Sequence, residues 1–358
     1  MDKATTSRID WLDSCKGFAI ILVVLGHIIY GCIANGIFLA NELVMRCIYN
    51  LIYLFHMPLF FVLSGYIFYR NYCADGVSKK RSFALSVINN TYVYILFSII
   101  QWLAIVLVSS GVSQLNSVAE TTNHLTSITD LIMIPLRPIN LMWYLYVLIF
   151  YYLFFYWIES RKINDTAKLT IFALVSIAGN IAALFTDFGG IFDLERFLRN
   201  IVFFYLGIYI SKYPGTKFLS SSSIPVLAAG SAASAAAVII FVDTDLRFIP
   251  AAGTISAGFI SLFFVNIFSN NRTAGNSKIL NLCGRFSLEI YLTHWVILSV
   301  MRAAFYRLGI NSFIMLLITS LLTGIFIPIG CSAIMKKIGI HKLVFRPASY
   351  LKDKKTDR

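Results

Sequence analysis

Residues Arg8–Tyr30 read RIDWLDSCKGFAIILVVLGHIIY, a charged opening followed by an almost wholly apolar run. The apolar run continues to Ala34, so residues 15–34 are long enough to cross a bilayer as a helix. Lys16 and His27 are eleven residues apart, which places them on one helical face about 16 Å apart along the axis. Ionisable groups at membrane depth are costly and normally face a protein interior or a wet cavity. The stretch therefore predicts a membrane helix that carries a functional site along one face.

The composition of the whole chain agrees with this class. Hydrophobic residues make up 58% and charged residues 13%, and the mean hydropathy is +0.76. Soluble domains have about 45–50% apolar and about 25% charged residues. The six cysteines are scattered without CxxC or Cys/His spacing, so we expect neither a disulfide framework nor a metal site. The sequence predicts an all-α polytopic membrane protein, and we expect no nucleic acid as a partner despite the net charge of +13.

Ten apolar segments are visible, and their even number places both termini on the same side of the membrane. Most of the 30 lysines and arginines fall at the two ends and in alternate loops, whereas acidic residues gather in the other loops. By the positive-inside rule, both termini are then cytoplasmic. We divide the chain into an integral-membrane unit, 1–340, and a basic cytoplasmic tail, 341–358, which orients the chain or contacts anionic lipid. The ten segments are 15–34, 46–69, 85–109, 139–158, 167–185, 197–211, 224–242, 249–268, 282–304 and 313–335. The bases assigned to the cytoplasmic side before the tail are Lys3, Arg8, Arg70, Lys79, Lys80, Arg81, Arg161, Lys162, Lys168, Lys212, Lys217, Arg272, Lys278, Lys336 and Lys337, opposed by acids in the other loops such as Glu42, Glu120, Asp193 and Asp243.

Three histidines fall inside predicted spans. His27 is either a catalytic group or a packing residue that bonds a neighbouring helix, and membrane depth favours function. His56 precedes Pro58, which kinks the second helix, so it either lines a cavity or makes a structural contact at the kink. His294 lies in the ninth span, and spacing alone does not say whether it meets His27.

The ninth span also contains Arg285 and Glu289, which are four residues apart and can neutralise each other along one face. A guanidinium at Arg285, near the cytoplasmic end, suits a phosphate. Asp13 precedes Lys16 by one turn and either neutralises the helix start or holds Lys16 extended toward an anionic ligand.

Residues 140–157, NLMWYLYVLIFYYLFFYW, are rich in aromatic side chains, most of which we assign to packing. Trp143 and Tyr144 at the outer end can also stack on a sugar ring.

Four stretches together resemble acyltransferase family 3, the bacterial membrane acyltransferases that modify cell-surface polysaccharides. LDSCKGFAIILVVLGH resembles the family's first-span signature, with Lys16 and His27 as its basic residue and histidine. FHMPLFFVLSGYIF, NLMWYL and GRFSLEIYLTH resemble the family's later motifs, in order and in spacing. Lys16, where the family more often has Arg, fits a subgroup that resembles fucose 4-O-acetylase-like proteins. KKRSFALSVINNTYVYIL, after the second span, keeps the family's basic start but lacks its later Arg and Pro-Tyr pair.

The resemblance implies transfer of an acyl group, usually acetyl, from cytoplasmic acyl-coenzyme A (acyl-CoA) to a sugar hydroxyl of a surface glycan or its lipid-linked precursor. It places the protein in the bacterial cytoplasmic membrane, in contact with membrane lipid and without a metal. His27 would act as general base or as acyl relay. A secondary transporter or exporter is the alternative, because it shares the span count and the buried ionisable groups. The resulting site prediction assigns His27, Lys16, His56 and His294 to catalysis, Lys16, Arg70, Lys80, Arg81 and Arg285 to the coenzyme, and Asp13, Trp143, Tyr144 and Glu289 to the acceptor.

Overall fold

The computed structural model describes residues 9–39, 41–74, 79–111, 127–186, 190, 192–243 and 249–348. Within these residues the chain is helical and contains no β-strand. Several residues used in the topology argument lie outside the described residues, namely Lys3, Arg8, Glu120 and the tail residues 349–358.

Nine helices in this part of the chain are long and apolar enough to cross a membrane. The tenth predicted segment, 197–211, lies in α8 (Leu194–Lys212), whose first two turns carry Glu195, Arg196 and Arg199. The predicted all-α polytopic fold is therefore confirmed. The nine helices are α1 (Asp10–Asn35), α2 (Glu42–Phe68, extended by the π-helical turn η1, Tyr69–Cys73), α3 (Lys80–Gly111), α6 (Trp143–Glu159, preceded by the 3₁₀ turn η3, Asn140–Met142), α7 (Asp165–Phe185), α9 (Ile224–Ile240, preceded by the 3₁₀ turn η5, Ser221–Ser223), α10 (Pro250–Asn270), α13 (Ser287–Arg307) and α14 (Phe313–Lys337).

Helix ends coincide with residues that stop or start helices. Gly36 adopts the left-handed conformation (φ 62°) that ends α1. Asn41 begins α2, because its side-chain oxygen accepts a hydrogen bond from the Val44 N–H. The remaining helical segments are short: α5 (Ile128–Ile132), η4 (Lys217–Leu219), α11 (Arg272–Gly275), α12 (Lys278–Arg285) and α15 (His341–Phe345).

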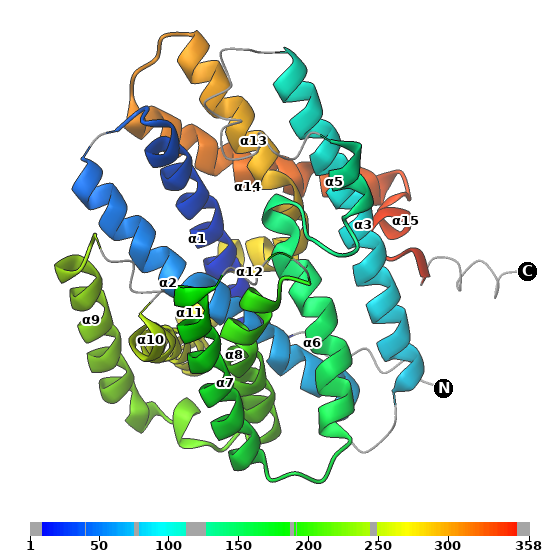
Figure 1. Ribbon diagram of the computed structural model, residues 1–358, viewed down its shortest axis with the longest axis vertical. Helices are drawn as coiled ribbons and strands as arrows, with labels where there is room; N and C mark the ends of the chain where they lie inside the picture. Colours follow the sequence, from blue (N-terminus) through cyan, green and yellow to red (C-terminus); the bar gives the residue numbers. More distant parts are fainter. Residues whose placement is uncertain are drawn as a thin grey trace, which may run out of the picture.

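Helix α1 lies at the centre of the bundle (Figure 1). It packs against α2, α10, α12, α13 and α14, and more than half of its residues are buried. The face of α1 that we predicted to be functional is therefore enclosed by neighbouring helices. The bundle has two ends. The N-terminal end is where α1 begins and α2 ends; the far end contains the α1–α2 turn and the start of α6.

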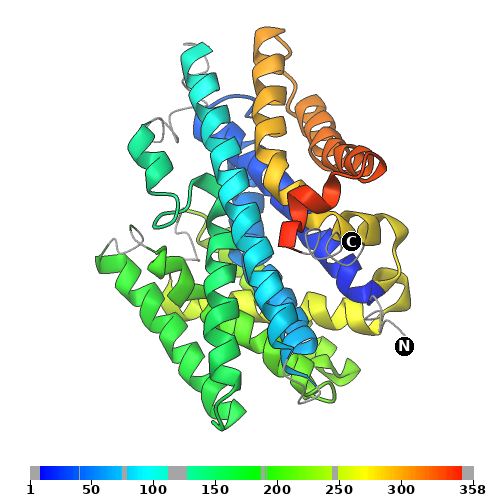
Figure 2. The ribbon, with the colours of Figure 1, turned by 90° about the vertical axis from the view of Figure 1, so that its right-hand side faces the viewer.

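An aromatic core joins α2, α6 and α8. Phe61, Phe68, Tyr151, Phe155 and Phe204 are fully buried there, as expected for most of the aromatic stretch of α6. Helix α3 runs beside α6 on the other side (Figure 2).

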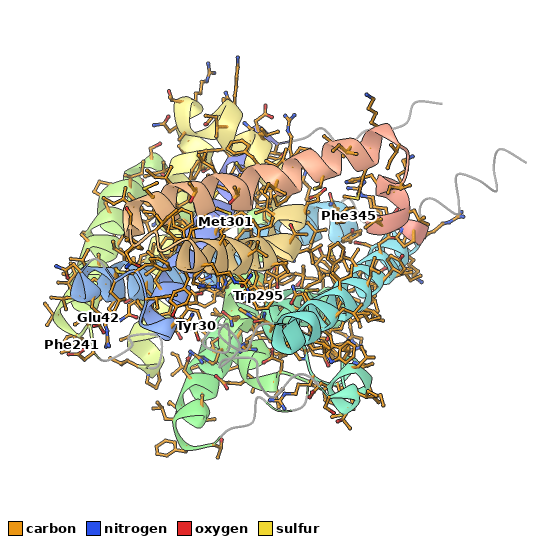
Figure 3. The ribbon with its side chains drawn as sticks, turned by 90° about the horizontal axis from the view of Figure 1, so that it is seen from above. Tyr30, Glu42, Phe241, Trp295, Met301 and Phe345 are labelled. Atoms are coloured by element: carbon orange, nitrogen blue, oxygen red, sulfur yellow. The ribbon has the colours of Figure 1, made fainter. Side chains whose placement is uncertain are left out.

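Helix α15 packs on the bundle at the start of the basic tail. The ring of Phe345, which is labelled in Figure 3, is buried and stacks on Phe97 of α3 at 5.7 Å between centroids. The Ala348 N–H donates to Asn89 Oδ1 at 3.0 Å. Residues 341–348 therefore pack against α3.

Helices α2 and α8 cross in backbone contact, and a substitution at this crossing tests the packing. A Cβ added at Gly207 would overlap the Val62 carbonyl oxygen, whereas one added at Gly258 on α10 would meet open space. We expect Gly207→Ala to cost about 1–3 kcal/mol of stability through overpacking, and Gly258→Ala to cost nothing. Thermal unfolding of both variants in detergent checks this; equal Tm values for the two would contradict the crossing.

Candidate functional site

A cavity of about 660 Å³ enters the bundle at the far end and reaches the middle of α1. Its walls come from α1, α2, η3, α6, α7, α8, α10 and α13. Side chains able to act on a ligand line it at two levels. His27, Tyr53 and His56, in the middle of α1 and α2, form the inner level; Asn140, Trp143 and Arg196, at the starts of η3, α6 and α8, lie toward the mouth.

His27 is held from two sides. Its Nδ1 lies 3.1 Å from the hydroxyl of Tyr53 on α2. On the other side, its ring centroid is 5.2 Å from that of His294 on α13. The structure thus brings together the first-span and ninth-span histidines, a contact that sequence spacing left open.

The tautomer of His294 follows from its hydrogen bonds. Its Nδ1 is 2.9 Å from the carbonyl oxygens of both Ile290 and Tyr291. A carbonyl can only accept, so Nδ1 carries the proton and Nε2 holds a lone pair. This Nε2 is buried and has no hydrogen-bond partner among the described residues. An unmet acceptor in a membrane interior is costly. His294 is fully buried and does not line the cavity, so the group that it faces is the ring of His27.

His56 combines the two roles considered for it. It lines the cavity beside Pro58, and its Nδ1 donates to the Ile52 carbonyl at 2.7 Å. Its ring packs edge-on against Tyr53, with 4.8 Å between centroids. His56 therefore fixes Tyr53, which in turn contacts His27.

Lys16 and Asp13 lie away from the cavity, at the N-terminal end. Lys16 Nζ pairs with Asp13 Oδ1 at 3.1 Å, and neither residue lines the cavity. Helix α12 lies against this part of α1 in backbone contact, since a Cβ added at Gly284 would overlap the Asp13 carbonyl.

Arg285 and Glu289 do not share a helical face, contrary to the sequence prediction. The helix breaks at Phe286, so Arg285 ends α12 and Glu289 lies in the first turn of α13. Arg285 Nη2 is 3.9 Å from Asp10 Oδ1. Glu289 is buried and its Oε1 accepts from His341 Nε2 at 3.1 Å. Glu289 therefore connects α13 to α15 and does not line the cavity.

Of the two predicted aromatic acceptor residues, one lines the cavity. Trp143 does so, with the Arg196 guanidinium 5.0 Å from its ring centroid. Tyr144 is turned away and shares a 2.7 Å hydrogen bond with Ser64 of α2. Arg70, Lys80 and Arg81 lie at the N-terminal end, in η1 and the start of α3. Lys80 and Arg81 are exposed there.

Sequence reasoning missed Tyr53 and Asn140. Tyr53 carried no signal, because tyrosines are frequent along α2. Asn140 opens the NLMWYL motif and adopts φ 45°, and its buried Nδ2 has no partner among the described residues. Phe192 (φ 59°) and Asp193 (φ 48°) have similar conformations, and Asp193 also lines the cavity. Such conformations are costly for residues other than glycine and concentrate at functional sites.

Burial also affects Asp193 at the cavity mouth. Its pKa is raised above the usual value by desolvation, an effect that the neighbouring Arg196 opposes. Arg196 Nη1 donates to Asp193 Oδ2 at 2.9 Å. Among the described residues, no cluster of three or more His, Cys, Asp or Glu side chains suits a metal ion.

Comparison with known proteins agrees with the motif resemblance. A family model described as "Acyltransferase domain" matches residues 9–335. "Nodulation protein NolL" of Sinorhizobium fredii (strain NBRC 101917 / NGR234) is 34% identical over 94 residues, which span 26% of this chain and 23% of that relative. No solved structure matches the chain significantly. Because the family model covers nearly the whole chain, the protein belongs to acyltransferase family 3.

Proposed function

We propose that the protein transfers an acetyl group from acetyl-CoA, or a larger acyl group from another acyl-CoA, to a sugar hydroxyl of a surface glycan or its lipid-linked precursor. The observation that carries the proposal is the position of His27. It lies at the inner level of a cavity large enough for a sugar, on the helix whose other end carries Lys16. The acyl group would approach from the N-terminal end and the acceptor from the far end.

Direct transfer needs one proton acceptor at the reacting hydroxyl. The His27 imidazole takes the hydroxyl proton while the oxygen attacks the thioester carbon, so that a C–O bond forms and the C–S bond breaks. The departing thiolate then takes the proton, and the reaction releases free coenzyme A with no net proton change. In the relay alternative, His27 attacks the thioester itself and passes the acyl group on.

Tyr53 and His294 are the positioning groups in both schemes. The Tyr53 hydroxyl orients the His27 ring through Nδ1. The lone pair on His294 Nε2 favours a protonated group beside it. The ring of His27 lies beside it, with 5.2 Å between the ring centroids. A base that becomes cationic during the reaction gains from such an acceptor.

The acceptor would occupy the outer part of the cavity. Trp143 offers an aromatic face for a sugar ring, and Asn140, whose Nδ2 has no partner among the described residues, offers an amide for its hydroxyls. The mouth is open at the end of the bundle, which suits an acceptor held by a lipid at the membrane surface.

The donor would bind at the N-terminal end, where Arg70, Lys80, Arg81, Lys278 and Arg285 gather. Coenzyme A is polyanionic, and a basic surface raises its local concentration. A shallow depression of about 380 Å³ is lined by Lys278 and Arg285 together with Asp10. Because α12 closes against α1 here, passage of the acyl chain toward His27 requires these two helices to separate.

The placement of donor and acceptor at opposite ends of the bundle agrees with the membrane orientation that we propose. Both termini would be cytoplasmic in a bacterial inner membrane, which places the donor surface beside cytoplasmic acyl-CoA. The acceptor cavity would then open to the outside, and transfer would occur from one side of the membrane to the other.

Turnover of labelled acetyl-CoA by the purified protein in nanodiscs, with a surface oligosaccharide as acceptor, tests the proposal. We expect Trp143→Ala to raise the acceptor KM about three- to tenfold, because an aromatic contact contributes about 0.5–1.5 kcal/mol. The matched control is Trp157→Ala on the same helix, since Trp157 is 53% exposed and outside the cavity. An acceptor KM that is the same in the two variants would remove Trp143 from the acceptor site.

A further inference from the structure

Arg302 is a buried cation inside a membrane-spanning helix. It lies in α13, five residues before the helix ends, and only 7% of its surface is exposed. Placing a charged side chain in the interior of a membrane protein is expensive, and such residues normally pair with an opposite charge. The role of Arg302 therefore requires an explanation.

Within the described part of the chain, no carboxylate forms an ion pair with Arg302, and its Nε makes no hydrogen bond. Lys168 provides the comparison, because it is equally buried and has two carboxylates within 3.3 Å. Ser299, one turn before Arg302 on α13, has a buried hydroxyl that is also without a partner among these residues. Two adjacent donors, one of them cationic, are thus left unsatisfied on the same helix.

The guanidinium is placed by a notch in α1. Arg302 Nη1 occupies the space that a Cβ atom at position 31 would fill, so the guanidinium fits there because residue 31 is a glycine. Figure 3 labels Tyr30 and Met301, the residues that precede Gly31 and Arg302 on the two helices. Gly31 is one helical turn beyond His27, a rise of about 6 Å. Arg302 therefore lies one turn outward from His27, along the same side of α1.

The cavity mouth carries the same sign of charge. Its charged lining consists of Arg137, Arg196 and Arg199 against Asp193 and Glu195. Arg196 pairs with Asp193 and Arg199 with Glu195, so the mouth has a net charge of +1, which attracts anions. Arg302 and Ser299 do not line the cavity, so an anion held there meets the guanidinium only when the Arg302 side chain turns from Gly31 toward the cavity.

We infer that Arg302, with Ser299, binds an anionic oxygen group of the acceptor, a carboxylate or phosphate carried by the sugar whose hydroxyl is presented to His27. The inference rests on the proposed function and deepens it: the acceptor class is an acidic or phosphorylated sugar. Arg302 is a binding residue, and the guanidinium donates to the anionic oxygens without taking part in the acyl transfer.

Binding of defined sugars to the purified protein tests this without any acyl donor. Methyl β-glucuronide and glucose 1-phosphate are compared with the neutral methyl β-glucoside, by calorimetry in phosphatidylcholine nanodiscs. We expect at least one of the two anionic sugars to bind about tenfold more tightly than the glucoside. Arg302→Met should abolish this preference and leave binding of the glucoside unchanged, and Gly31→Ala should have the same effect by displacing the guanidinium. Arg307→Met, at the exposed end of α13, is the matched control and should keep the preference.

The unfolding temperature gives a second measurement. Removing an unpaired buried charge should leave the Tm of Arg302→Met equal to or above that of the wild type, whereas a purely structural arginine would lower it. Equal binding of anionic and neutral sugars by the wild type would overturn the inference, as would a preference that survives Arg302→Met. An effect of Arg302→Met that appears only with phosphatidylglycerol in the nanodisc would overturn it too, because the anion would then be a lipid headgroup. Failure of acetyl transfer with every sugar would count against the proposed function alone, since the binding comparison needs no transfer.

Discussion

His27→Gln is expected to lower acyl transfer by about 10²- to 10⁴-fold, the contribution of a positioned general base. Glutamine preserves much of the size of the imidazole and can still contact Tyr53, but it neither accepts a proton at neutral pH nor carries an acyl group. The loss should therefore appear in kcat, with little change in the acceptor KM.

Release of the coenzyme A thiol and transfer of label to the acceptor measure this effect. The matched control is His341→Gln, because His341 pairs with Glu289 away from the cavity and should retain activity. The unfolding temperature of His27→Gln should stay close to that of the wild type, since among the described residues the ring makes a single hydrogen bond, to Tyr53. Full activity of a folded His27→Gln protein would rule out both chemical roles of His27.

Lys168→Met is expected to destabilise the protein by about 3–5 kcal/mol, the cost of removing one partner from a buried ion pair. Lys168 Nζ lies 2.8 Å from Glu159 Oε1 and 3.3 Å from Asp165 Oδ1, and its side chain is 4% exposed. Lys212 completes the group at 2.7 Å from Asp165 Oδ2. Two ammonium groups thus balance two carboxylates where α6, α7 and α8 meet, and the substitution leaves one carboxylate uncompensated.

The same network includes Tyr213, whose hydroxyl donates to Asp165 Oδ2 at 2.6 Å. This hydrogen bond raises the pKa of Tyr213, so the tyrosine remains a donor at pH values above the ordinary tyrosine pKa. Because the pKa is raised in the folded state, the stability it contributes is present below the ordinary tyrosine pKa and is lost at more alkaline pH.

Thermal unfolding in detergent measures the Lys168 effect. Lys162→Met, an exposed lysine in the preceding connection, is the control and should leave the Tm unchanged. Adding Glu159→Gln to Lys168→Met should recover part of the loss, because the uncompensated carboxylate is then gone. A Lys168→Met protein as stable as the Lys162→Met protein would show that the network does not hold these helices together.

The membrane fold could be predicted because it depends on local properties of the sequence. Apolar length alone locates nine of the ten helices, and α8 is weaker only because Glu195, Arg196 and Arg199 occupy its first turns. The break at Phe286 was not predicted, because α12 and α13 are both helical and their combined sequence gives one continuous helical pattern. The separation of Arg285 from Glu289 depends on how α12 packs against α1, which periodicity does not describe.

The site was predictable only in part, because it is built by contacts between helices. His27 stands out within its own helix as an ionisable group at depth. Its contact with His294 joins residues 267 positions apart, and the role of Tyr53 is defined by one hydrogen bond between α1 and α2. Arg302 lies at the end of the predicted ninth span, where an arginine is ordinarily an interfacial anchor. Its burial became visible only with the notch at Gly31.

Transfer of label from acetyl-CoA to a sugar acceptor by the purified protein in nanodiscs tests the central claim most directly. The account predicts thiol release that depends on the acceptor, labelled sugar in equal amount, and loss of both in His27→Gln. Absence of thiol release with acetyl and longer acyl donors across acidic, phosphorylated and neutral sugars would contradict it, and so would release that His27→Gln leaves unchanged.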